Sequence, residues 1–69
     1  MKLNARNQIA ATVTNVTTGP ATAVVELDAN GIRLVASITA EAASELGLAE
    51  GSRVTAVVKA SDVILATDE

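Results

Sequence analysis

The sequence predicts an all-β fold with one short helix. Apolar and polar residues alternate along most of the chain, which is the pattern of half-buried strands. Asn30-Gly31 interrupts the alternation with a pair that strongly favours a two-residue hairpin turn. One segment, residues 40–46, has the composition and flanking residues of a helix. The order of three strands, a helix and two further strands favours an OB-like, five-stranded, partly open barrel.

The first expected strand contains a change of register. Its alternation runs to Val13, and the next inward apolar residue, Val16, comes three positions later rather than two. A β-bulge near Asn15 explains this shift, because a bulge inserts one extra residue into a strand. Gly19-Pro20 then ends the strand as a turn. The inward residues before the bulge are Ile9, Ala11 and Val13.

The second and third expected strands form a hairpin around Asn30-Gly31. Both turn residues tolerate the positive φ that a type I′ turn requires. Apolar residues at alternate positions on each side of the turn assign one face of both strands to the core. The inward residues are Ala21, Ala23, Val25 and Leu27 in the second strand, and Ile32, Leu34, Ala36 and Ile38 in the third.

The segment after the third strand carries helix signals. Thr39 is expected to be the N-cap, and Glu41 lies in the first turn, where the helix dipole favours an acidic side chain. Gly47 stands at the C′ position, which often adopts the left-handed conformation that ends a helix. These signals predict a helix of about two turns with Ala43 and Leu46 on one side.

Two more strands are expected after the helix. Glu50-Gly51-Ser52 is a turn that leads into the fourth strand. Ser61-Asp62 leads into the fifth strand, which covers residues 63–66. The inward residues of the fourth strand are Val54, Ala56 and Val58.

The chain is short and lacks the usual means of stabilising a small fold. Its 69 residues indicate a single domain spanning 1–69, and 49% are hydrophobic, yet none is Phe, Tyr, Trp, Cys or His. A domain of this size is marginal, and disulfides and the usual structural zinc sites are excluded. Association with further copies is the remaining common solution. Apolar residues expected on the outward faces also indicate subunit contacts, although β-branched residues favour strands in any case. They are Val24, Val35 and Val57.

Composition and charge weigh against several classes of function. Without His or Cys the chain lacks the commonest general base and the most reactive nucleophile, so an enzyme is not expected. The net charge of −3 and the absence of aromatics argue against a nucleic-acid surface. No apolar segment approaches the ~20 residues that span a membrane, and the first residues lack the apolar stretch of a secretory signal. A cytoplasmic binding protein is therefore expected.

Two cations that adjoin small residues favour a site for a tetrahedral oxyanion. Arg6 precedes the first strand and Lys59 follows the fourth. Arg presents a rigid fork of donors and Lys a compact charge, while backbone N–H groups and the side chains of Asn4 and Ser61 supply neutral donors. In an acidic protein such a site must be local, and a position between subunits would combine cations from different chains. The alternative is that both are ordinary solvated cations at strand ends.

Other polar groups are weaker candidates. Thr39 stands at a helix N-terminus, where free N–H groups can face an anion, so it is kept as a candidate ligand although its simplest role is a cap. The acidic residues in and after the helix favour a solvated face over a metal site, and no bare metal cation is expected as a ligand. They are Glu41, Glu45 and Glu50.

Four segments of the chain, taken together, carry a family resemblance. They are Asn4-Ala5-Arg6-Asn7-Gln8, Glu45-Leu46-Gly47-Leu48, Glu50-Gly51 and the stretch from Thr55 to Val63. In these segments the chain resembles the molbindin (Mop) family, whose members are single molybdate-type TOBE domains. The resemblance extends over essentially the whole chain.

This resemblance implies a hexamer, built as a trimer of dimers, in which OB-like subunits bind molybdate or tungstate between chains. Carried over by position, the ligands are two cations, two backbone donors and a nearby hydroxyl: Arg6, Lys59, Ala5, Ala60 and Ser61. The family's usual Ser is Asn4 in this chain, and the Asn4 amide can also donate to an oxyanion.

The leading hypothesis is a non-enzymatic protein that stores or buffers molybdate or tungstate. Such a dianion is held by charge-assisted hydrogen bonds, and binding it needs no organic cofactor. Two alternatives come from other classes. One is an OB-type nucleic-acid-binding module, and the other is a purely structural oligomer whose outer β-surface docks a partner.

Overall fold

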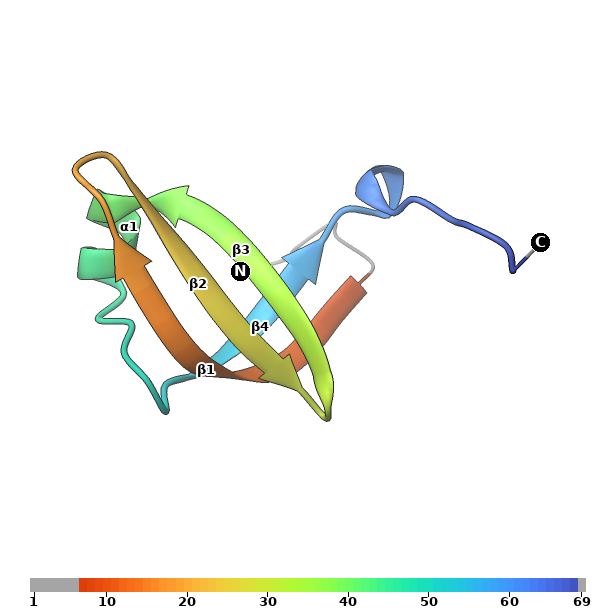
Figure 1. The fold of residues 1–69 in the computed structure, drawn as a ribbon, viewed down its shortest axis with the longest axis horizontal. Helices are drawn as coiled ribbons and strands as arrows, with labels where there is room; N and C mark the ends of the chain where they lie inside the picture. The colour runs from red at the N-terminus through yellow and green to blue at the C-terminus, as the bar shows by residue number, and fades with distance from the viewer. Residues whose placement is uncertain (1–6, 69) are drawn as a thin grey trace.

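The computed structural model describes residues 7–68, which form one antiparallel sheet with a short helix at one end (Figure 1). The strands have the order β3-β2-β1-β4 in the sheet. The predicted all-β fold with one short helix is confirmed. The elements are β1 (Asn7–Thr18), β2 (Thr22–Ala29), β3 (Ile32–Thr39), α1 (Ala40–Glu45), β4 (Arg53–Val58) and the 3₁₀ turn η1 (Ala60–Asp62).

Strand β1 is long because it pairs with two neighbouring strands. Residues from Asn7 to Thr12 pair with β4, and residues from Thr12 to Thr18 pair with β2. The register shifts between Val13 and Asn15, at the point where β1 passes from one partner to the other. The predicted bulge is confirmed. Because a bulge bends its strand and increases the local twist, this bend curls the sheet around its inner face.

The inner face of the curled sheet carries a core of small side chains. Val13, at 1% exposure, is its largest fully buried side chain. The buried residues are Ala11, Val13, Ala23, Val25, Leu27, Ala29 and Ala43. Three residues that the alternation assigned inward are exposed instead, because each lies at or near a strand end that no other element of residues 7–68 covers. They are Ile9, Ala21 and Ile32.

The hairpin between β2 and β3 has the predicted turn. Asn30 (φ 54°) and Gly31 (φ 93°) both have positive φ, as a type I′ turn requires. The carboxylate of Asp28, which lies in β2 just before the turn, accepts a hydrogen bond of 3.1 Å from the Gly31 N–H. This bond stabilises the turn.

Both ends of α1 are capped as the sequence predicts. The Thr39 hydroxyl accepts a hydrogen bond of 3.0 Å from the N–H of the third helical residue. At the other end Gly47 has φ 63°, and the N–H groups of Gly47 and Leu48 donate to the carbonyls of Ser44 and Ala43. This pair of bonds is a Schellman motif, which satisfies carbonyls that the last turn would leave free.

The helix was predicted to carry Ala43 and Leu46 on one side, and the structure buries only Ala43. Ala43 is 7% exposed, whereas Leu46 is 69% exposed. The physical reason is that the helix ends at Glu45, so Leu46 is the C-cap and the chain turns back after it. Leu48, which follows this turn, packs against the core instead.

The predicted fifth strand does not form among residues 7–68. Residues 60–62 form η1, and residues 63–66 continue past it, leading away from the sheet (Figure 1). Ile64 is 92% exposed and Leu65 is 88% exposed. A strand requires a hydrogen-bonded neighbour, and no neighbour among residues 7–68 pairs with this segment. The sheet therefore has four strands rather than five, and β3 and β4 are its open edges.

The turn can be tested with two glycine substitutions. We expect Gly31→Ala to lower the free energy of unfolding by about 1–2 kcal/mol, because a Cβ makes the left-handed region costly. Gly19→Ala is the matched control, since Gly19 does not have positive φ and its new Cβ would lie 3.4 Å from the nearest atom. Its unfolding free energy should change by no more than about 1 kcal/mol. Urea unfolding measures both, and equal losses would contradict the turn assignment.

Candidate functional site

The pairing of β1 with β4 brings together two strand ends that adjoin candidate segments in the sequence. Asn7, the first residue of β1, pairs with Val58, the last residue of β4. The side-chain amide of Asn7 also donates a hydrogen bond of 3.1 Å to the Val58 carbonyl. Arg6 comes directly before Asn7 in the sequence, and Lys59 comes directly after Val58. The ladder and this side chain therefore tie together the two strand ends from which the candidate cations depart.

Lys59, Ala60 and Ser61 form an exposed cluster of donors after β4. Lys59 is the N-cap of η1, with extended backbone at φ −61° and ψ 138°. The N–H groups of Ala60 and Ser61 lie in the first turn, where a helix offers no internal acceptor. Within residues 7–68 no hydrogen bond uses these two N–H groups. The cluster thus offers one positive charge, two backbone donors and one hydroxyl in three consecutive residues.

Three predicted site residues, Asn4, Ala5 and Arg6, lie outside the described residues. Their roles remain predictions. What the structure does define is Asn7, the first residue of β1 and the residue that follows Arg6 in the sequence. Sequence reasoning did not single out Asn7 for its side chain, because its hydrogen bond to Val58 depends on the register of two strands that lie far apart in the chain.

Thr39 lies at the opposite end of the sheet from the Lys59 cluster. It is the last residue of β3 and pairs with Thr22, whereas Lys59 follows β4 at the Asn7 end of β1. Figure 1 shows the corresponding separation of α1 from η1. The Thr39 hydroxyl is engaged in capping α1. Within one chain the structure does not bring Thr39 together with Lys59, and its role as a ligand remains a prediction.

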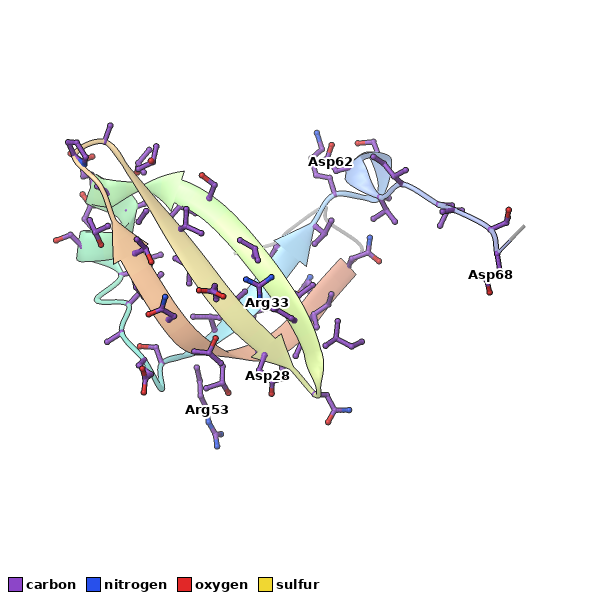
Figure 2. The ribbon with its side chains drawn as sticks, in the orientation of Figure 1. Asp28, Arg33, Arg53, Asp62 and Asp68 are labelled. Carbon is purple, nitrogen blue, oxygen red and sulfur yellow. The ribbon has the colours of Figure 1, made fainter. Side chains whose placement is uncertain are left out.

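The other two described cations have different positions. Arg33 forms an ion pair of 2.6 Å with Glu26 on the outer face of the β2–β3 hairpin. Asn15 donates a further hydrogen bond of 3.0 Å to Glu26. The hydrogen bond from Arg33, more than that from Asn15, lowers the pKa of the Glu26 carboxyl below its ordinary value of 4.5. Arg53 stands at the start of β4, and Figure 2 shows it extending away from the sheet. Lys59 is therefore the described cation at the Asn7–Val58 end.

Residues 7–68 contain neither a metal-binding cluster of side chains nor a membrane-spanning helix. No group of three or more acidic side chains is placed to hold a metal ion. No helix in this part of the chain is long and apolar enough to cross a membrane.

Comparison with known proteins identifies the family. The TOBE domain model matches residues 3–65, so the chain belongs to the TOBE-domain family. It is 39% identical over 66 residues to molybdenum-pterin-binding protein 2 from Clostridium pasteurianum, which covers 94% of this chain and 97% of that protein. These findings confirm the predicted resemblance to the Mop family.

A longer relative and a solved structure agree with this assignment. The chain is 48% identical over 67 residues to the molybdenum-pterin-binding protein MopA from Rhodobacter capsulatus, covering 96% of this chain and 25% of MopA. It spans about a quarter of the length of the longer curated relatives that it matches. The structure of a molybdate binding protein from Sporomusa ovata superimposes with a TM-score of 0.94 at 37% identity, covering 97% of this chain and all of that one.

The Glu26 network can be tested by titration. We expect Arg33→Gln to raise the pKa of Glu26 toward 4.5, because it removes the largest cause of the lowering. A carboxyl whose pKa is lowered by folding stabilises the protein above its unfolded pKa, and this contribution is lost as the pH falls through the folded pKa. The variant should therefore lose less stability than the parent on acidification through that range. Carbon-13 NMR of the Glu26 carboxyl and urea unfolding measure the two effects.

The matched control is Arg53→Gln, which removes the same charge from a position without this contact. It should leave the pKa of Glu26 unchanged. An equal pKa rise in both variants would show that general charge, and not the Arg33 contact, lowers the Glu26 pKa.

Proposed function

We propose that this protein binds molybdate non-covalently between copies of the chain and serves in molybdenum storage or homeostasis. The observation that supports the proposal is the pairing of Asn7 with Val58 at one end of the sheet. Asn7 follows Arg6 in the sequence, and Val58 precedes Lys59. Support also comes from the names of the relatives and from the likeness to the molybdate binding protein from Sporomusa ovata.

The donor set suits a tetrahedral dianion. Lys59 supplies a point charge, and the N–H groups of Ala60 and Ser61, which have no partner among residues 7–68, supply directed neutral donors. Asp62 follows directly and offsets the charge of Lys59, so one chain's described cluster has little net positive charge. A second cation is needed, and Arg6 is the candidate because it directly precedes Asn7. Charge-assisted hydrogen bonds from both cations would then hold the anion without any chemical step.

The site is proposed to lie between copies because the described donors cover one side only. The Lys59 cluster is exposed, and a bound anion needs donors on its other sides to replace its hydration shell. Large apolar side chains are also exposed in numbers that indicate subunit contacts, among them Val24, Val35 and Val57. The hexamer, the cytoplasmic location, the capacity for tungstate and the role of Thr39 remain predictions.

The ligand is proposed to be the free oxyanion rather than a pterin, although several relatives are named molybdenum-pterin-binding proteins. A pterin ring is planar and aromatic, and this chain has no Phe, Tyr or Trp on which such a ring could stack. The exposed donors of the Lys59 cluster suit oxygen atoms. We accordingly assign no organic cofactor and no enzymatic activity to the chain.

Titration calorimetry tests the identity of the ligand. Sodium molybdate without any pterin should saturate the protein, and tungstate should compete for the same sites because the two anions have the same shape and charge. Sulfate should bind more weakly, since donors fixed by the backbone cannot contract around a smaller ion. Saturation only in the presence of a pterin, or equal affinity for sulfate and molybdate, would contradict this assignment.

Paired charge substitutions test the site. We expect Lys59→Gln to weaken molybdate binding roughly 10- to 100-fold, which corresponds to the loss of about 1.5–3 kcal/mol for a charged hydrogen bond. Arg53→Gln makes the same change in net charge at the other end of β4 and should leave the affinity near that of the parent. Arg6→Gln should resemble Lys59→Gln. Equal weakening in the Lys59 and Arg53 variants would show that overall charge, and not this cluster, governs binding.

A further inference from the structure

We propose that Asn30 is a site of spontaneous deamidation and that the Asp28 carboxylate slows this reaction by holding the Gly31 N–H. In deamidation the asparagine side chain loses ammonia through a cyclic imide that it forms with the next backbone nitrogen. The product is a covalently modified turn between β2 and β3. This proposal concerns the chemistry of the turn, and it does not depend on anion binding.

The reaction requires only the chain and water. The Gly31 nitrogen loses its proton and forms a bond to Cγ of Asn30, while the bond from Cγ to the side-chain nitrogen breaks. That nitrogen takes up one proton, which replaces the one lost from Gly31, and leaves as ammonia. Water then opens the five-membered imide at either of its carbonyls and gives aspartate or isoaspartate. Nothing is oxidised or reduced.

Asn30 is distinguished first by the residue that follows it. The attacking nitrogen belongs to a glycine, which has no side chain to obstruct the approach to Cγ. The other described asparagines are Asn7 and Asn15, which are followed by Gln and by the β-branched Val. A side chain on the following residue crowds the nitrogen, and a β-branched one is also stiff. Ring closure is therefore sterically easiest at Asn30.

Asn30 is distinguished next by its side chain. The side-chain amide of Asn7 donates a hydrogen bond of 3.1 Å to the Val58 carbonyl, and that of Asn15 donates one of 3.0 Å to the Glu26 carboxylate. Within residues 7–68 no hydrogen bond engages the side chain of Asn30. Ring closure requires this side chain to rotate until Cγ faces the next nitrogen. An amide without a partner can rotate without breaking a bond.

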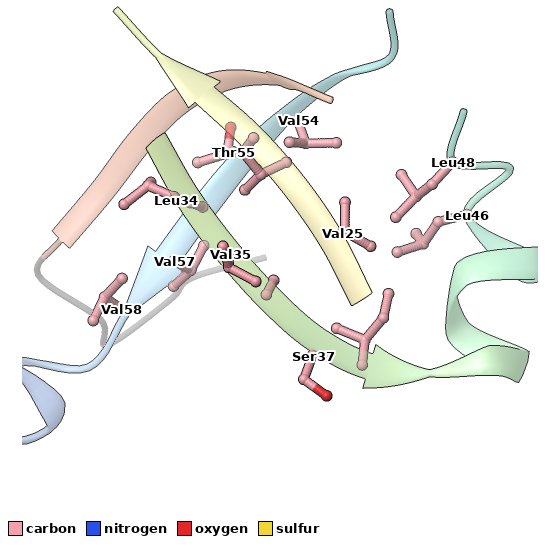
Figure 3. A pocket seen from close by; sticks show the side chains of 14 residues that line it. Val25, Leu34, Val35, Ser37, Leu46, Leu48, Val54, Thr55, Val57 and Val58 are labelled. Atoms are coloured by element: carbon pink, nitrogen blue, oxygen red, sulfur yellow. The ribbon is translucent and has the colours of Figure 1, made fainter. Parts of the chain in front are cut away.

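The turn is open to water. Asn30 and Gly31 are both exposed, and a Cβ built on Gly31 would meet nothing within 4 Å beyond its chain neighbours. The hollow between β3 and β4, with a volume of about 480 Å³, is lined on β3 by residues 34–38 and does not include the turn (Figure 3). Within residues 7–68 nothing therefore shields the turn from the water that opens the imide.

Asp28 restrains the nitrogen that must react. Its Oδ1 accepts the Gly31 N–H at 3.1 Å, in a turn where Asn30 and Gly31 have φ of 54° and 93°. Ring closure requires this nitrogen to move toward Cγ of Asn30 and to lose the same proton that the carboxylate holds. A hydrogen bond to an ionised acceptor is roughly twice as strong as a neutral one. Breaking it adds to the barrier, so the turn contains both the reactive pair and its restraint.

Either product changes the hairpin. Aspartate and isoaspartate each add a negative charge to a chain whose net charge is −3. Isoaspartate also adds a backbone carbon to a two-residue turn whose dihedral angles match the twist of the flanking strands. Accumulation of the modified form would therefore loosen the pairing of β2 with β3 as the protein ages.

Peptide mapping by mass spectrometry tests the site. After incubation of the full chain in mildly alkaline buffer, Asn30 should be converted to aspartate and isoaspartate several-fold faster than Asn7 or Asn15, with one ammonia released per converted residue. Asn30→Gln should abolish most of this ammonia release, because its longer side chain would have to close a six-membered ring. Conversion of Asn30 no faster than that of Asn7 and Asn15 would overturn the assignment.

Three further variants test the restraint. Asp28→Ala should accelerate conversion of Asn30 about 2- to 10-fold, the factor that corresponds to one hydrogen bond. Asp28→Asn keeps the shape with a weaker, neutral acceptor, so it should give a smaller rise, and it decides the test if the alanine variant fails to fold. Asp68→Ala is the matched control, because it removes the same charge from an exposed position outside the turn, and it should convert at the parent rate.

The restraint is overturned if conversion in the Asp28 variants is unchanged or slower. A slower reaction would show that the carboxylate acts as a base that removes the Gly31 proton. An equal acceleration in Asp68→Ala would show that overall charge, and not the contact with Gly31, sets the rate.

Discussion

The structure depends on a core that is built almost entirely from alanine and valine. Small side chains allow the sheet to curl tightly around Val13 and Val25, but they bury little apolar area, and no aromatic residue adds to it. Leu27 is the largest residue in this core. The stability of a chain of this size is marginal even with a full core. The exposed apolar side chains on both faces and along the open edges therefore have a physical explanation, because one copy has too little interior to bury them.

β1 connects this core to the candidate site. Its bulge divides it into a half that pairs with β2 and a half that pairs with β4. The bend that closes the core around Val13 is thus made by the same strand whose first residue, Asn7, fixes the end of β4. The Lys59 cluster departs from that end. A change in the core near the bulge would alter the bend of β1 and so the position of Asn7 and the paired end of β4. The site would therefore be affected although no core residue belongs to it.

The sequence predicted the elements whose signals are local. Alternation located four strands, and Asn30-Gly31, Thr39 and Gly47 marked a turn and two helix ends that the structure confirms. Features that depend on long-range pairing were missed or misjudged. The exposure of Leu46 follows from where the helix ends, and a shift of one residue reverses it. The pattern in residues 63–66 indicated extended backbone, but it could not show whether a partner strand was present in the same chain.

The same distinction applies to the candidate site, and the small core has a consequence for regulation. Motifs identified Lys59 as a candidate, but only the register with Asn7 shows where its strand ends. If copies associate as proposed, the fold is more stable when protomers are abundant. At low expression, isolated chains would be open to proteases and chaperones. The cell's capacity to hold the anion would then rise more steeply than the number of chains it makes, so synthesis rate alone would set a threshold for storage.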